Sequence, residues 1–187
     1  PDIKFSDVAG MDQVKKELSE KLIHPFEHSE AAERYGVKTG GGVLLWGPPG
    51  TGKTYIARAL AGEIDATFYS IAPAGIFEKY VGSTESNIAE LFKHARNQPR
   101  SVMFFDEVDE LFRRRNDNSS GSKNVVPHLL DEMDGVKGGN ENLLFLGATN
   151  FPQQIDKAFL RPGRFDLDIE ITLPDKEARI GLFKLHL

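Results

Sequence analysis

Short apolar runs recur along the chain, and glycine, proline or charged residues bound each of them. Runs of about 4–8 such residues are typical of strands that are buried on both faces of a sheet. The sequence predicts five strands, at residues 43–46, 66–72, 101–107, 142–150 and 168–173.

Between these runs, apolar residues recur at three- and four-residue spacing among charges, the pattern of amphipathic helices. Helices are predicted at residues 11–26, 30–36, 51–64, 84–96, 125–135 and 175–187, with a short turn or helix at 73–79 and a polar loop at 113–124. Pro25 is expected to end the first helix. Strands that alternate with helices indicate an α/β fold, with a parallel sheet and helices on both faces. In such sheets, sites lie at the carboxyl ends of the strands.

The composition is that of one globular domain. The chain has 187 residues, of which 40% are apolar and 27% are charged, and its formal net charge is −5. This mild acidity argues against a protein that coats nucleic acid, and no nucleic-acid partner is expected. The sequence has no cysteine, which excludes disulfides, thiolate zinc sites and cysteine nucleophiles. It also has no membrane-length apolar run and no secretory signal, so we expect a cytoplasmic location.

The stretch GPPGTGKT has the spacing of a phosphate-binding P-loop and lies between a predicted strand and a predicted helix. Backbone N–H groups and the helix N-terminus favour an anion there. Lys53 is placed to reach the β- and γ-phosphates, and the Thr54 hydroxyl to bind Mg²⁺. The alternative is a glycine-rich turn that binds nothing; the presence of strand, loop, lysine, threonine and helix together argues against it. The predicted nucleotide contacts here are Gly47, Pro48, Pro49, Gly50, Thr51, Gly52, Lys53, Thr54 and Tyr55.

The third predicted strand ends in acidic residues, in FFDEVDE. Beside a P-loop, Asp106 is placed to support Mg²⁺, usually through bound water. Glu107 is placed to polarise an attacking water. Asp109 and Glu110 are expected on the next helical turn, in ordinary solvated positions. The acidic strand end together with the P-loop favours nucleotide hydrolysis over passive binding.

Two further polar features follow later strands. Asn150 ends the fourth predicted strand, where its amide either faces the attacking water and γ-phosphate or makes a local turn before Phe151 and Pro152. In LRPGRFD, Arg161 and Arg164 flank a Pro-Gly pair that predicts a turn. Neither arginine has a partner nearby in sequence, so the residues alone allow a solvated basic corner as well as a functional pair.

Together these motifs resemble the AAA ATPases. Over nearly its whole length and in that family's order, the chain carries FSDVAG, GPPGTGKT, EKYVG, FFDEVDE, EMDG, GATN and LRPGRFD. The sequence is most similar to protein-remodelling members: the valosin-containing-protein (Cdc48-like) unfoldases, the proteasome-activating ATPases and the membrane-bound AAA proteases. The resemblance implies a five-stranded P-loop sheet, Mg²⁺-dependent ATP hydrolysis and a ring, usually of six subunits.

The resemblance also implies roles for single residues. Asp106 supports the metal, Glu107 activates water, and Asn150 matches the sensor that positions this water. Arg161 and Arg164 match the pair that reaches the ATP of the neighbouring subunit, where a guanidinium neutralises charge on the phosphoryl group. In the isolated domain both arginines are expected to be exposed.

Two other segments acquire a role only through the resemblance. Asp7, Val8 and Ala9 match the adenine-contacting stretch; otherwise they fit a turn before a helix. The first pore loop, which grips a polypeptide in the ring, is matched by Lys79, Tyr80, Val81 and Gly82. On the residues alone, a core position near a helix start is favoured for Tyr80.

We therefore expect the motor domain of a ring-forming unfoldase, with ATP, Mg²⁺ and a polypeptide substrate as its partners. The alternatives are the ATPase module of a membrane-bound AAA protease, a nucleotide-dependent assembly module with little turnover, and a nucleic-acid translocase. Both ends look like cuts through a longer protein, and the family's small helical lid should begin where the sequence stops. Residues 1–187 are thus expected to form an excised large ATPase subdomain with weak nucleotide affinity and little ring formation.

Overall fold

The computed structural model of the chain is built on a parallel sheet of five strands, in the order β2-β3-β4-β1-β5. It describes residues 3–28, 41–72, 84–110, 125–135 and 139–186. The strands are β1 (Gly41–Trp46), β2 (Thr67–Ile71), β3 (Ser101–Phe105), β4 (Leu143–Thr149) and β5 (Phe165–Glu170). All four pairings between neighbouring strands are parallel, so the predicted α/β fold is confirmed.

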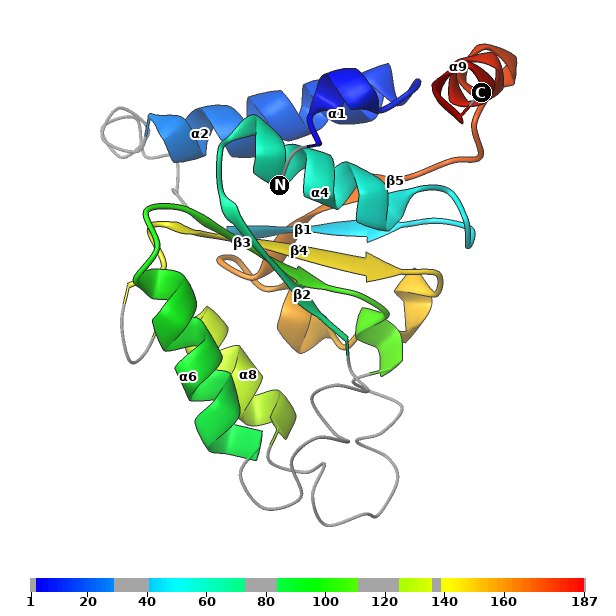
Figure 1. Ribbon diagram of the computed structural model, residues 1–187. Coiled ribbons are helices and arrows are strands. Elements are labelled where there is room, and N and C mark those ends of the chain that lie inside the picture. The colour runs from blue at the N-terminus through cyan, green and yellow to red at the C-terminus, as the bar shows by residue number, and fades with distance from the viewer. Residues whose placement is uncertain (1–2, 29–40, 73–83, 111–124, 136–138, 187) are drawn as a thin grey trace.

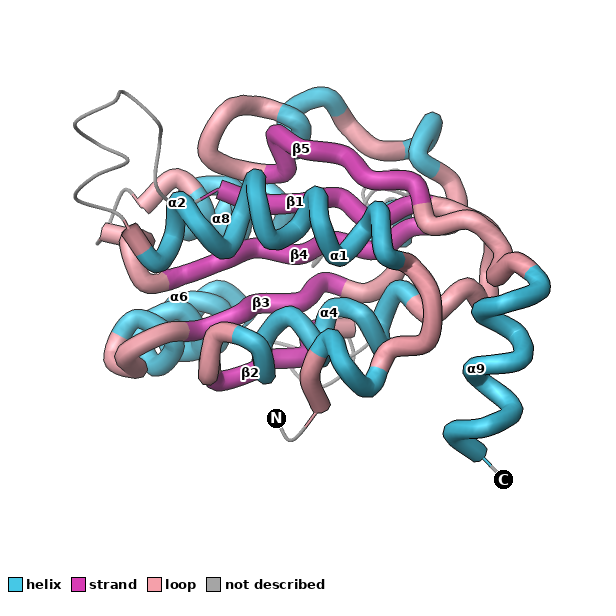
Figure 2. Tube along the Cα trace, turned by 90° about the horizontal axis from the view of Figure 1, so that it is seen from above, coloured by secondary structure: helices cyan, strands magenta, loops and turns pink. Residues whose placement is uncertain are grey.

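Helices cover both faces of this sheet (Figure 1). One face carries α1 (Asp12–Leu18), the π-helical turn η2 (Ser19–Ile23), α2 (His24–Glu27) and α4 (Lys53–Glu63). The other face carries α6 (Thr84–Arg96) and α8 (Val125–Met133). The last helix, α9 (Lys176–His186), extends beside the sheet (Figure 2), and the 3-10 helices are η1 (Phe5–Asp7), η3 (Pro152–Gln154) and η4 (Lys157–Leu160).

Each central strand contributes to two hydrophobic cores, because successive side chains point to opposite faces. In β3, Val102 and Phe104 pack in the core that includes α1, α2 and α4. Met103 and Phe105 pack in the core that includes α6 and α8. The central strands β1, β3 and β4 are therefore buried on both faces, and the carboxyl ends of the parallel strands share one edge of the sheet.

The first helix passes through Pro25, contrary to the prediction that it stops there. In η2 the N–H of His24 donates to the carbonyl of Ser19, five residues earlier, and α2 continues the helix to Glu27. Pro25 lies in the first turn of α2. Proline is tolerated there because the N–H that it lacks would have no partner within α2. Phe26 is buried beyond the proline, so packing against the core holds the helix together across it.

The fifth strand begins and ends three residues earlier than predicted. Phe165 is buried and pairs with Gly42, just before a register shift between β5 and β1. Along β5 the acids Asp166, Asp168 and Glu170 are exposed, so this edge strand buries one face only. The prediction followed the apolar residues 168–173, whereas the strand follows the alternating pattern.

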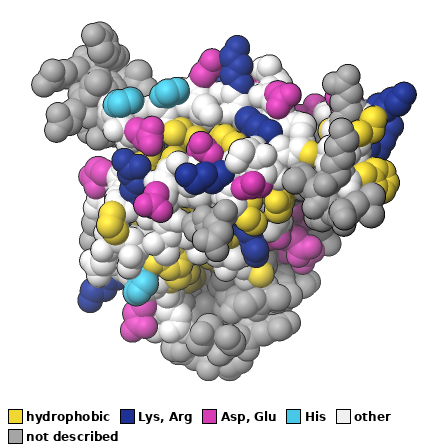
Figure 3. Space-filling view, turned by 45° about the horizontal axis from the view of Figure 1, so that its top comes forward, with side chains coloured by type: hydrophobic (Ala, Val, Ile, Leu, Met, Phe, Trp, Pro, Cys, Tyr) yellow, Lys and Arg dark blue, Asp and Glu magenta, His cyan; other side chains and the backbone are white. Residues whose placement is uncertain are grey.

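Three predicted segments lie outside the described residues: the helix at 30–36, the turn or helix at 73–79 and the loop at 113–124. The other predicted helices are confirmed within a few residues. In the part of the chain that the structure describes, no helix has the length and hydrophobicity to span a membrane. On the face that carries α1, α2 and α4, acidic and basic side chains are intermixed (Figure 3).

Candidate nucleotide site

The P-loop joins β1 to α4 at the carboxyl edge of the sheet. Gly47 has a φ of +152°, and a Cβ there would lie 2.1 Å from the carbonyl oxygen of Ile171. Gly52 has a φ of +92° and caps the N-terminus of α4. The loop therefore requires glycine at both positions, first for close approach of two backbones and then for a left-handed conformation.

The ammonium group of Lys53 lies inside this loop. Its Nζ donates to the carbonyls of Gly47 at 2.9 Å and Pro48 at 2.8 Å. The Thr51 hydroxyl donates to the same Pro48 carbonyl at 2.9 Å, which tightens the turn. Burial lowers the pKa of Lys53, and the carboxylate of Asp106 opposes that shift. A cation within a turn that opens a helix is the arrangement that binds a phosphate group.

Thr54 and Asp106 meet although they belong to different elements. Thr54 lies in the first turn of α4, Asp106 follows β3, and the Thr54 hydroxyl donates to Oδ2 of Asp106 at 3.4 Å. Among the described residues, no group of three or more histidine, aspartate or glutamate side chains could hold a metal ion. A hydroxyl and a carboxylate fit Mg²⁺, which takes one or two protein ligands and completes its shell with phosphate and water.

Glu107 lies just beyond β3 with a left-handed backbone, at a φ of +49°. Its N–H donates to Oδ1 of Asp106 at 3.0 Å, and its carbonyl accepts from the N–H of Glu110 at 2.9 Å. Positive φ is uncommon outside glycine, and such residues cluster at functional sites. The turn holds the Asp106 carboxylate in place while the Glu107 side chain stays exposed to solvent.

Asn150 follows β4, which lies between β3 and the P-loop strand β1. The residue before it, Thr149, is 2% exposed, and its hydroxyl donates to Oδ1 of Asp109 at 2.5 Å. The Thr149 carbonyl accepts from the N–H of Gly47 at 3.3 Å. Asp109 is 4% exposed, so the prediction that it is solvated is wrong: β4 supplies a buried hydrogen bond to its carboxylate. Asn150 thus directly follows Thr149, which is hydrogen-bonded both to Asp109 after β3 and to Gly47 after β1.

The predicted turn in LRPGRFD is present, but its two arginines have different surroundings. The Arg164 N–H donates to the Arg161 carbonyl at 3.1 Å, and Gly163 has a φ of +90°. Arg161 is exposed, as predicted. Arg164 is only 6% exposed, so the prediction of an exposed side chain is wrong here. Its guanidinium pairs with Asp134, Nε to Oδ1 at 2.7 Å and Nη2 to Oδ2 at 2.6 Å, and Nη1 donates to the Ala158 carbonyl.

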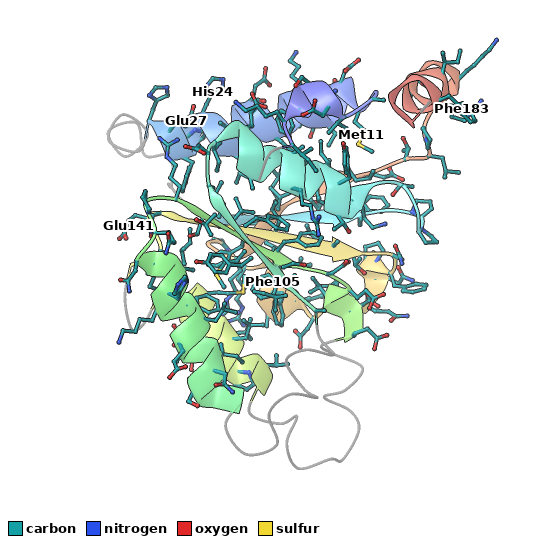
Figure 4. All side chains as sticks on the ribbon, in the orientation of Figure 1. Met11, His24, Glu27, Phe105, Glu141 and Phe183 are labelled. Carbon is teal, nitrogen blue, oxygen red and sulfur yellow. The ribbon has the colours of Figure 1, made fainter. Side chains whose placement is uncertain are left out.

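A cavity of about 1020 Å³ adjoins the P-loop. The predicted adenine contacts Asp7, Val8 and Ala9 line it together with P-loop residues and Tyr55, whose hydroxyl donates to the Asp7 carbonyl at 3.3 Å. Met11 extends from the start of α1 toward α4 (Figure 4) and lines the same cavity.

The sequence interpretation missed the opposite wall of this cavity. That wall consists of Ile171, Thr172, Leu173, Pro174 and Asp175 from the connection between β5 and α9, and of Ala178 from the first turn of α9. The rule that sites form at the carboxyl ends of strands applies to β5 as well, and it is the signal that points to these residues.

The structure thus brings most of the predicted ATP and metal contacts to adjoining strand ends. Lys53, Thr54, Asp106, Glu107 and Asn150 follow β1, β3 and β4, the three central strands. The catalytic roles of these residues stay predictions. The predicted pore-loop residues Lys79, Tyr80, Val81 and Gly82 lie outside the described residues.

Residues 43–173 match the sequence model of a family described as "ATPase family associated with various cellular activities (AAA)". Over its whole length, the chain is 41% identical to the "Cell division cycle protein 48 homolog" of Archaeoglobus fulgidus. It is also 41% identical to "Protein SAV" of Sulfolobus acidocaldarius, again over its whole length. The chain spans about a quarter of these relatives, 26% of the first and 24% of the second.

Proposed function

The chain belongs to the AAA family of ATPases, and from this premise we propose that it is the ATP-hydrolysing domain of a ring-forming unfoldase that threads polypeptide through a central pore. The observation that carries the ATPase part is the meeting of Lys53, the Thr54–Asp106 pair and Glu107 at adjoining strand ends. A P-loop that only bound nucleotide would need the first two features, whereas Glu107 adds a group suited to activating water.

Nucleotide binding is assigned to two adjoining parts of the site. The backbone of the P-loop and the Lys53 ammonium bind the phosphates. The base is assigned to the cavity beside the loop, between Val8, Ala9 and the β5–α9 connection. At about 1020 Å³, the cavity is just larger than the roughly 300–1,000 Å³ common for ligand pockets, so it has room for a whole nucleoside.

Hydrolysis is assigned to the strand ends that face this loop. Glu107 accepts a proton from the attacking water, and the Asn150 amide orients that water from β4. Thr54 and Asp106 hold Mg²⁺, which neutralises charge on the phosphate oxygens when bound. Arg161 supplies a further positive charge to the nucleotide of a neighbouring subunit, so turnover depends on assembly into a ring.

The pore is supported by sequence and by relatives. The motif EKYVG places Tyr80 where a pore aromatic is expected, and one relative is described as a Cdc48 homolog. Glu107 argues against a domain that only assembles in response to nucleotide and has little turnover. Such an assembly module needs no group that activates water. The ATPase module of a membrane-bound AAA protease differs in its flanking domains and has the same ATP chemistry.

Phosphate release by the full-length protein, with Mg²⁺ and then with EDTA, tests the proposal. We expect Glu107→Gln to lower turnover by about 10²–10⁴-fold, the usual contribution of a general base, while ATP binding is retained. Glu90→Gln, which changes an exposed glutamate on α6, is the matched control and should hydrolyse ATP normally. Normal turnover in Glu107→Gln would remove the residue from this role, and a wild-type protein that binds ATP without hydrolysing it would favour the assembly module.

A further inference from the structure

Arg164 uses all three nitrogens of its guanidinium within its own chain. Nε and Nη2 bond to the two carboxylate oxygens of Asp134 at 2.7 and 2.6 Å, and Nη1 donates to the Ala158 carbonyl. The side chain is 8% exposed. By contrast, the Arg161 guanidinium is exposed and, of the described residues, none forms a hydrogen bond or ion pair with it. The two arginines therefore cannot have the same role in this conformation.

The bonds of Arg164 connect three elements around the turn that carries Arg161. Asp134 directly follows α8, Ala158 lies in η4, and Arg164 itself directly precedes β5. The turn between η4 and β5 is closed by the bond from the Arg164 N–H to the Arg161 carbonyl. A forked pair between guanidinium and carboxylate fixes orientation as well as distance. The backbone of Arg161 is thus held at a fixed place while its side chain stays accessible.

We infer that Arg164 is a positioning residue, which acts through Asp134 of the same chain to aim Arg161, and that Arg161 alone reaches the phosphate of a neighbouring subunit. To reach another subunit itself, Arg164 would have to break a two-pronged pair in which its own side chain is 8% exposed and that of Asp134 is 42% exposed. It would also leave the Ala158 carbonyl without this donor. Both losses are unfavourable. This inference rests on the proposed function, because it takes from there the role of Arg161 in trans.

The two roles predict different behaviour for Asp134. If Arg164 acts through the ion pair, removing either partner releases the same turn, so the two single variants and the double variant should lose turnover equally. If Arg164 contacts phosphate directly, Asp134 has no part in the reaction and its removal should leave turnover intact. Asp134 is therefore the residue that separates the two interpretations.

The experiment measures kcat and KM for ATP in the full-length protein carrying Asp134→Asn, Arg164→Gln or both. We expect kcat to fall about 10²-fold in all three, the effect of a misplacement of about 1 Å, with KM for ATP within about twofold and ring assembly unchanged. A merely structural role would instead weaken folding, ATP binding and assembly together. Asp131→Asn, an exposed acid one helical turn earlier on α8, is the matched control and should keep wild-type kcat.

Arg161→Ala keeps the inference separate from the function on which it rests. We expect this variant to lose about 10³–10⁵-fold in kcat, the contribution of an arginine finger. If it loses nothing, the proposed role in trans is wrong. If it loses activity while Asp134→Asn retains full kcat, the proposed function stands and the positioning role is overturned. If Arg164→Gln does not fold, Arg164→Lys replaces it, because lysine keeps the charge but cannot form the two-pronged pair. A wild-type kcat in Arg164→Lys would also overturn the positioning role.

Discussion

Replacing Thr149 with valine would remove one hydroxyl from the junction of three strand ends. That hydroxyl donates to Oδ1 of Asp109 at 2.5 Å and accepts from the N–H of Phe151 at 2.9 Å. Thr149 and Asp109 are 2% and 4% exposed, so water cannot readily replace the lost donor. The variant tests whether these bonds hold the residue between them, Asn150, in place.

The expected loss follows from these contacts. A buried hydrogen bond to a charged group contributes about 1.5–3 kcal/mol, and the neutral bond from Phe151 about 0.5–1.5 kcal/mol. The methyl group that replaces the hydroxyl returns about 0.8 kcal/mol by burial. The free energy of unfolding should therefore fall by about 1–4 kcal/mol. The midpoint of about 2.5 kcal/mol lowers the melting temperature of a chain of this size by roughly 5–10 °C.

Urea unfolding measures this change through the fluorescence of Trp46, the single tryptophan, which lies at the end of β1. Thr149→Ser keeps the hydroxyl and is the control; it should lose only what the missing methyl contributes, about 1 kcal/mol. Turnover of Thr149→Val should fall more than ATP affinity does, because the change lies beside Asn150 and not in the P-loop. A valine variant within about 0.5 kcal/mol of the wild-type chain would show that these bonds do not hold the junction.

Three further changes test other parts of the molecule. Gly47→Ala would place a Cβ 2.1 Å from the Ile171 carbonyl oxygen, so the P-loop must shift and both stability and ATP affinity should fall; calorimetry with ATP and urea unfolding that match the wild-type chain would contradict this. Lys53→Ala should abolish ATP binding in calorimetry, whereas Lys93→Ala, at an exposed position on α6, should not. Tyr80→Ala should keep ATP turnover within about twofold but stop unfolding of a polypeptide substrate. If that variant still unfolds the polypeptide substrate normally, Tyr80 is a core residue and not a pore contact.

The sequence predicts those parts of the site whose signals are local. In the P-loop the strand, the glycines, Lys53 and the helix are contiguous, and Asp106 and Glu107 directly follow an apolar run. By contrast, Asp134 pairs with Arg164 across 30 residues, and Asp109 meets Thr149 across 40. A single sequence does not indicate which acid lies opposite which donor. The order of the strands in the sheet brings them together, and neither segment alone determines that order.

Two local rules gave wrong boundaries, each for a physical reason. Proline usually ends a helix, but the π-turn before Pro25 and the buried Phe26 after it keep the first helix intact. A strand was predicted where apolar residues gather at 168–173, whereas β5 begins at Phe165 because this edge strand buries alternate residues. Tertiary packing overrides the local preference in the first case and selects the alternating pattern in the second.

Because Glu107 has a left-handed backbone, selection for thermal stability and selection for activity should favour different residues at this position. A residue with a side chain costs about 1–2 kcal/mol in that conformation, a cost that glycine avoids and asparagine reduces. A library selected for heat resistance alone should therefore accumulate glycine or asparagine at this position and lose turnover. A library selected for ATP hydrolysis should keep the glutamate and gain its stability at distant positions.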